Sequence, residues 1–285
     1  PLTVLEDGPP DQLLALVPGR GAAQIGEERM VVLGRHGRGG WLGSLATGPN
    51  ATLRWKLSLA DEIELRDLVR LSPDGDTLLL VGGRRKQQST PWSAVMERGD
   101  EPAHLVRQDD LTLVGVAAES SLRTIVDLGA AGFAALGSAG SGPGVEHEQL
   151  FVAGFDRSGK PTWSRVLDEV RAGAVLGVAA REGHALFLVS VPLIDIDDRG
   201  RPVQSVALID LVPAVESDDE AEGKAAVVVT SRMLEGSESW TTAGFVDHRA
   251  EAIALYGQRP AGIVWRLVGV PESAPESAPD NTPEN

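Results

Sequence analysis

One short apolar run occurs five times along the chain, and this repeat limits the fold more than any other feature of the sequence. Each copy has four apolar residues followed by glycine or, once, by serine. That length suits a strand buried on both faces and is too short for a buried helix. The copies are spaced by roughly 50 to 70 residues, in or near the range typical of propellers and repeat arrays. They lie at residues 30–34, 78–82, 133–137, 186–190 and 253–257.

Each repeat has room for four short strands. In the first repeat, apolar segments at 13–17, 40–45 and 52–57 accompany the run at 30–34. The same order recurs later, so the run is the second strand each time. The last repeat lacks a fourth strand, and residues 2–5 can supply it. We therefore predict an all-β fold, a β-propeller of five four-stranded blades closed by the N-terminal strand, which removes two open sheet edges.

A propeller of six blades is the alternative, if residues 111–123 or an acidic insertion at 216–223 contain further strands. The propeller is expected to span residues 1–270 as a single domain, because a hydrophobic content of 42% can supply a full core. Residues 271–285 are rich in Pro, Glu, Ser and Ala and are too polar to pack. We expect them to form a disordered tail.

Composition excludes several classes of function. A net charge of −15 argues against binding to a nucleic-acid backbone, which needs clustered cations. The chain has no cysteine, which excludes disulfides, thiolate metal sites and a cysteine nucleophile. No apolar run approaches the roughly 20 residues of a transmembrane helix.

The composition also bears on where the protein works. Arginine outnumbers lysine among the basic residues and alanine and glycine are abundant, a bias associated with bacterial genomes of high GC content. Pro1 stands where Met would begin a chain, so we expect that a leader or lipid anchor preceded it. These features predict an exported protein of the bacterial periplasm or cell surface.

Asp195, Asp197 and Asp198, which precede Gly200, form the first candidate metal site. Carboxylates at alternating positions before a glycine are how calcium loops begin. However, position 199 is arginine and no glutamate follows at the twelfth position, so a solvated hairpin turn is the competing interpretation. No other cofactor is indicated.

A second candidate site is the acidic insertion, with Asp218, Asp219, Glu220 and Glu222. It reads as a solvated loop, or as a surface on which a basic protein partner docks. Charge reversal of these residues should abolish such docking.

Catalytic constellations are absent from the sequence. The five histidines are scattered without metal-binding spacing, and no nucleophile elbow accompanies a plausible triad. His36 lies in a glycine- and arginine-rich hairpin that could meet an anionic ligand, but its spacing fits no phosphate-binding motif. Paired acids for glycoside cleavage are not testable from sequence, because the fold sets their separation.

Tryptophan positions carry a resemblance to a known family. Phe151-Val152-Ala153-Gly154 followed by Trp163, and Leu42 to Trp55, resemble the tryptophan-containing, quinoprotein-like repeats of bacterial exported β-propellers. The second repeat has Leu105 at the tryptophan position. Trp41 and Trp92 share one register and Trp55 and Trp163 another, as packing positions should. The resemblance implies the fold, and its members include both quinone-dependent enzymes and non-enzymatic scaffolds.

The sequence therefore favours a non-catalytic binding or scaffold propeller with a protein partner in an envelope assembly. The alternatives are a carbohydrate-active enzyme with acids on one propeller face, and a calcium-dependent lectin. Clustered carboxylates in a polar central channel would favour the enzyme, and an apolar plug there would exclude it.

Overall fold

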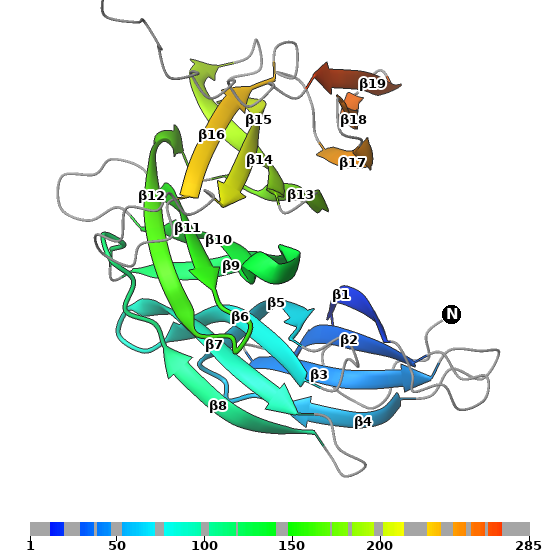
Figure 1. Cartoon of the computed structure of the whole chain (residues 1–285), viewed down its shortest axis with the longest axis vertical. Coiled ribbons are helices and arrows are strands. Elements are labelled where there is room, and N and C mark those ends of the chain that lie inside the picture. Colours follow the sequence, from blue (N-terminus) through cyan, green and yellow to red (C-terminus); the bar gives the residue numbers. More distant parts are fainter. Residues whose placement is uncertain are drawn as a thin grey trace, which may run out of the picture.

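The protein consists of five antiparallel sheets in sequence order, as the computed structural model shows (Figure 1). The first four sheets have four strands and the fifth has three, each in the simple order of the chain. In Figure 1 the sheets follow an arc, with the first and the fifth at its two ends. The structure describes residues 12–19, 29–36, 39–46, 53–71, 77–97, 103–117, 119–140, 148–171, 173–181, 184–196, 202–213, 227–234, 242–248, 252–259 and 262–269.

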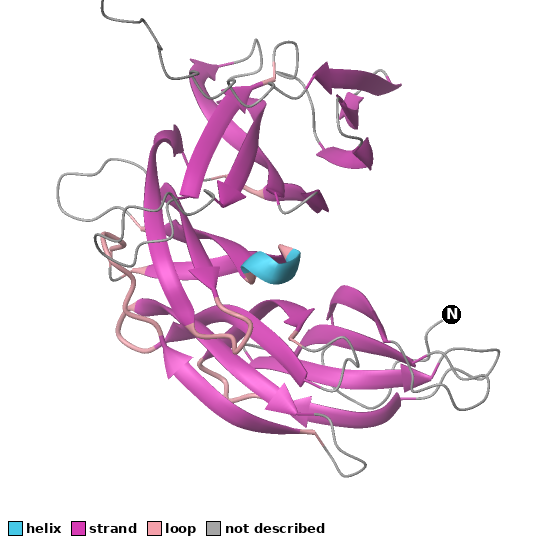
Figure 2. Cartoon of the chain, in the orientation of Figure 1, coloured by secondary structure: helices cyan, strands magenta, loops and turns pink. Residues whose placement is uncertain are grey.

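The described residues form nineteen strands and one 3-10 turn, so the predicted all-β class is confirmed (Figure 2). Residues 2–5, expected as a twentieth strand, and the tail at 271–285 lie outside the described part. Among the described residues, no helix is long and apolar enough to cross a membrane.

The strands of the first two sheets have the following bounds: β1 Gln12–Gly19, β2 Arg29–His36, β3 Gly39–Ala46, β4 Leu53–Ser58, β5 Ile63–Arg70, β6 Thr77–Arg85, β7 Ser89–Glu97 and β8 His104–Asp110. Those of the third and fourth sheets are β9 Ser120–Asp127, β10 Phe133–Ala139, β11 Gln149–Phe155, β12 Pro161–Arg171, β13 Val175–Arg181, β14 His184–Ile196, β15 Pro202–Pro213 and β16 Val227–Met233. The fifth sheet comprises β17 Thr242–His248, β18 Ala252–Arg259 and β19 Gly262–Gly269, and the 3-10 turn η1 is Gly129–Ala131.

The five apolar runs lie in β2, β6, β10, β14 and β18, each the second strand of its sheet, as predicted. Their double burial is visible in β6. Leu78 and Leu80 belong to the core shared with the first sheet, whereas Leu79 and Val81 belong to the core shared with the third. All four side chains are fully buried. The run is apolar throughout because both faces of its strand pack against neighbouring sheets.

Aromatic side chains fill the cores between consecutive sheets. Trp92 lies in the core between the first and second sheets, and Phe151 in the core between the second and third. Trp163 packs against the core between the third and fourth sheets. The predicted wedge role of tryptophan between sheets is thus confirmed for Trp92 and Trp163.

Every first strand contains a register shift that leaves one residue without a paired position. In β5 the shift lies between Leu65 and Asp67, so the extra residue is Arg66. Its effect is visible in the packing, since Leu65 and Leu68 are three residues apart and still enter the same core. Such bulges redirect side chains and are frequent beside functional sites. The extra residues are Leu14, Arg66, Arg123, Leu176 and Val246.

The glycine that closes the apolar run is required by a close approach to the first strand. A Cβ added at Gly82 would lie 2.1 Å from the backbone oxygen of Glu64, and one at Gly137 would lie 2.7 Å from that of Ser121. In the fourth sheet the apolar run ends in Ser190, and the glycine at the close contact is Gly173, in the segment just before β13. There a Cβ added at Gly173 would lie 1.6 Å from the oxygen of Ser190.

The register of the fourth strands corrects one expectation. Trp55 pairs with Ser44 and Trp163 with Gly154, each beside a register shift, so these tryptophans are equivalent as predicted. In the second sheet the same position is held by Arg107 opposite Val95, and not by Leu105. The prediction was wrong because counting along the sequence missed the bulge in β8. The guanidinium of Arg107 donates to the backbone oxygen of Gly159 in the third sheet at 2.6 Å.

A polar contact joins the first strands of the second and third sheets. Asp67 Oδ2 accepts hydrogen bonds from Thr124 Oγ1 at 2.6 Å and from the Ile125 amide at 3.0 Å. Asp67 Oδ1 accepts another from the Leu68 amide at 2.8 Å. Burial raises the pKa of Asp67, although the hydrogen bonds from Thr124, Ile125 and Leu68 oppose that effect. The ionised carboxylate is therefore less favourable at this joint than in an unfolded chain.

We predict that Gly82→Ala destabilises the fold by about 1–3 kcal/mol, the usual cost of forcing extra volume into a packed site. Its Cβ would collide with the backbone of β5, which cannot move without breaking the strand pair. Urea denaturation measures the loss. The control is Gly39→Ala, whose Cβ would approach nothing closer than 3.2 Å. Equal stability losses in the two variants would contradict this account.

We predict that Asp67→Asn removes a pH-dependent cost of folding. Because the folded-state pKa of Asp67 is raised, its contribution to stability is greatest below its ordinary pKa and is lost as the pH rises through the raised value. The free energy of unfolding of wild type minus that of the variant should therefore fall as the pH increases from about 3.5 to 7. Denaturation across this range measures it, and a difference that stays flat or grows would refute the assignment.

Candidate functional site

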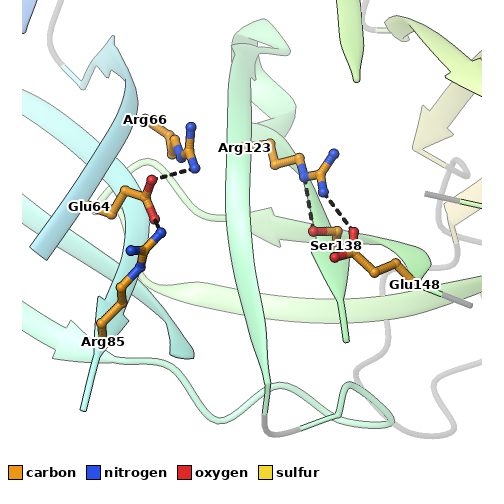
Figure 3. Close-up of polar contacts among 6 residues, drawn as sticks. All are labelled: Glu64, Arg66, Arg85, Arg123, Ser138 and Glu148. Carbon is orange, nitrogen blue, oxygen red and sulfur yellow. Dashed lines mark hydrogen bonds and ion pairs between the residues drawn. The ribbon is translucent and has the colours of Figure 1, made fainter. Parts of the chain in front are cut away.

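A polar cavity of about 760 Å³ lies where the first strands of the second, third and fourth sheets begin. Its walls come from the starts of β5, β9 and β13, from the β6–β7 hairpin, from the end of β10 and from Glu148, which directly precedes β11. The lining residues that carry the argument are shown in Figure 3: Glu64, Arg66, Arg85, Arg123, Ser138 and Glu148.

One buried carboxylate is shared by two arginines on the β5 side. Glu64 Oε1 lies 2.5 Å from Arg66 Nη2, and its Oε2 lies 2.8 Å from Arg85 Nη2. The side chain of Glu64 is 9% exposed, whereas those of Arg66 and Arg85 are 43% and 56% exposed. This cluster therefore carries more positive than negative charge, and both guanidinium groups reach solvent.

Arg123 is held in a fixed orientation on the β9 side. Its Nε donates to Ser138 Oγ at 2.9 Å, its Nη1 to the backbone oxygen of Gly173, and its Nη2 pairs with Glu148 Oε2 at 3.0 Å. Burial lowers the pKa of Arg123, the charge of Glu148 opposes this shift, and the charge of Arg66 adds to it. Arg66 and Arg123 both line the cavity, so two like charges face it from neighbouring sheets.

The two arginines reach the cavity for the same structural reason. Arg66 and Arg123 are the extra residues of the bulges in β5 and β9, in equivalent positions of neighbouring sheets. Side chains of a regular strand point alternately to the two faces of the sheet. Without the bulge, the residue after Leu65 or Leu122 would therefore point to the face opposite that leucine. The bulge allows a charged residue here while apolar residues on both sides stay in the core.

Hydroxyl and amide groups complete the wall. Ser89, Ser120 and Ser121 and the hairpin residues Gln87 and Gln88 line the same cavity. Ser120 Oγ donates to the backbone oxygen of Ala117 at 2.8 Å. Such groups can both donate and accept hydrogen bonds, which suits a ligand rich in hydroxyl groups.

The predicted site residues have side chains outside the described part of the chain. Asp195 lies at the end of β14 with its side chain outside the described residues, and Asp197 and Asp198 are wholly outside them. The same holds for the acidic insertion, Asp218, Asp219, Glu220 and Glu222. The calcium and partner predictions stay predictions. Within the described residues, no group of three acidic or histidine side chains could hold a metal ion.

Histidine is also absent from the cavity wall in the described part of the chain. His184 Nδ1 lies 3.1 Å from Asp210 Oδ1 at the start of β14, and His104 is exposed at the start of β8. His36 ends β2, and its side chain is outside the described residues.

The cavity residues left only a weak signal in the sequence. Two polar residues stand between core residues of a strand in Leu65-Arg66-Asp67-Leu68. The same arrangement, again with arginine first, occurs one sheet later in Leu122-Arg123-Thr124-Ile125. Aligning the two first strands would have shown the paired arginines. Glu64 and Glu148 carry no such signal, because only the fold brings them beside the arginines.

Comparisons with known proteins add little. The chain matches no known protein family, and no curated protein resembles it significantly in sequence. Among solved structures, the chain is similar to MPT-4, a mannose phosphorylase from Leishmania mexicana in complex with a phosphate ion. The match has 10% sequence identity and a TM-score of 0.40, and covers 90% of this chain and 83% of that one. Likeness at this level carries no inference about fold or activity.

Proposed function

We propose that this protein is a non-catalytic binding or scaffold β-propeller of five blades, exported to a bacterial envelope or surface assembly. The cavity at the first strands of its second, third and fourth sheets is its ligand site. The observation that carries the proposal is the placement of two bulge arginines in this cavity, Arg66 and Arg123, whose side chains are 43% and 26% exposed beside polar side chains.

Four consecutive four-stranded sheets followed by a three-stranded fifth, with cores between the successive sheets from the first to the fourth, support the propeller. In this proposal, residues 2–5 complete the three-stranded fifth sheet and close the ring. The quinoprotein-like resemblance is part of the same proposal. It rests on Trp55 and Trp163, which occupy equivalent positions.

The carbohydrate-active enzyme is the second candidate, because one observation favours it. Three glutamates, Glu64, Glu119 and Glu148, line the polar cavity. Two of them are engaged by arginines, and a sugar or water would have to displace a guanidinium to reach Glu64. This engagement favours binding over acid–base chemistry.

The enzyme candidate predicts that the protein releases reducing sugar from bacterial envelope polysaccharides. Such activity should fall by more than a hundredfold in Glu64→Gln or Glu148→Gln if either carboxylate is the general acid, base or nucleophile. Our proposal predicts no release above a no-protein control. Activity that these glutamate variants abolish would replace the proposal by the enzyme.

The scaffold proposal predicts that a basic protein of the envelope docks on the acidic insertion. Replacing Asp218, Asp219, Glu220 and Glu222 by lysine should abolish its capture from envelope extracts, because four attractive charges become repulsive. The control replaces Glu97 and Asp109, acidic residues of the second sheet, by lysine. A partner retained by the insertion variant, or lost equally from the control, contradicts docking at this site.

A further inference from the structure

The charges in the cavity leave a place for one more anion. Glu64 is the carboxylate contacted by both Arg66 and Arg85, so two guanidinium groups share one negative charge. Within the described residues, the contact of the Arg66 side chain is to Glu64 Oε1. A guanidinium has five N–H donors in a fork that matches a carboxylate or phosphate. Arg66 therefore has donors to spare for a ligand.

Arg123 presents a second cation from the neighbouring sheet. Ser138, Gly173 and Glu148 hold its guanidinium in place, so the group is already oriented before a ligand arrives. Preorganised donors avoid the entropy cost of ordering a long side chain on binding. An oxyanion between Arg66 and Arg123 would also relieve the repulsion between them.

The uncharged residues of the cavity wall further restrict the chemical class of the ligand. Ser89, Ser121, Gln87 and Gln88 lie on the same cavity as the arginines. A bare inorganic anion would leave these groups to water. A ligand with several hydroxyl groups beside its charge would use both parts of the wall.

We infer that the cavity binds a polyhydroxylated oxyanion, a sugar that carries a carboxylate or phosphate group, with the anionic group between Arg66 and Arg123 and the hydroxyl groups against the β6–β7 hairpin. This inference rests on the proposed function in taking the cavity as the ligand site. It adds the chemical class of the ligand, which the protein-partner experiment does not address.

Calorimetric titration with glucuronate, glucose 6-phosphate, glucose and inorganic phosphate tests the inference on the full chain. We expect at least one charged sugar to bind more tightly than glucose and than phosphate, and to weaken with added salt. Arg66→Gln should weaken that binding by roughly 10- to 100-fold, the usual value of a charge-assisted hydrogen bond. Whichever charged sugar binds more tightly identifies the carboxylate or the phosphate as the source.

Two further variants make the test independent of folding defects. Glu148→Gln, at a residue that is 55% exposed, keeps an oxygen that can accept from Arg123 and hold its orientation, but removes the negative charge that opposes an anionic ligand, so it should strengthen binding of the same sugar. Arg157→Gln is the matched control, because Arg157 is 39% exposed and pairs with Asp127 away from the cavity wall. It should leave the affinity unchanged.

Several results would overturn the inference. Glucose that binds as tightly as the charged sugars would refute an oxyanion ligand while leaving the cavity as the ligand site, provided that Ser121→Ala weakens it. Phosphate that binds as tightly as glucose 6-phosphate would refute the role of the hydroxyl groups. Binding of no probe, or equal weakening by Arg66→Gln and Arg157→Gln, would refute the inference itself. The capture experiment with the acidic insertion decides the scaffold proposal separately.

Discussion

The close approach between the first and second strands, seen in the second, third and fourth sheets, is the constraint on which the rest of the structure depends. At Gly82 and Gly137 a side chain would collide with the neighbouring backbone, and in the fourth sheet Gly173 meets the same limit from the opposite strand. The approach occurs beside the bulge, where the first strand gains a residue. The side chain of the extra residue therefore does not follow the alternation between sheet faces by which the other residues of the strand pack into the cores. Packing and the candidate site thus meet at one point in the second sheet and at one point in the third.

Much of the architecture could be predicted from the sequence, because it depends on local periodicity. Runs such as Leu78 to Val81 are apolar at every position, which a strand buried on both faces requires and an exposed strand does not. Turn residues separate these runs, so the positions of the strands and their order within each sheet could be predicted. Bulges have no comparable signal, since one extra residue changes pairing without changing composition. For that reason Leu105 was assigned to a position that Arg107 holds.

The candidate site was hidden for a different reason. Its residues come from six separate segments, and each charge taken alone resembles an ordinary surface residue. Only the fold shows that Glu64 meets both Arg66 and Arg85, and that Arg123 is oriented by Ser138 and Glu148. The acidic residues at 195–198 and 218–222 are adjacent in sequence, so they could be proposed as sites without the fold. The cavity residues are far apart in sequence, and only long-range sheet contacts bring them together.

The hydrogen bond between Asp67 and Thr124 has a consequence for the cavity. Apolar cores hold sheets together but are non-directional, so they tolerate sliding of one sheet along the next. A hydrogen bond of 2.6 Å between equivalent residues of two first strands does not tolerate it. Arg66 precedes Asp67 and Arg123 precedes Thr124, so this contact fixes the separation of the two bulges. The separation of the two bulge arginines is thus set from inside the protein, by residues that do not line the cavity.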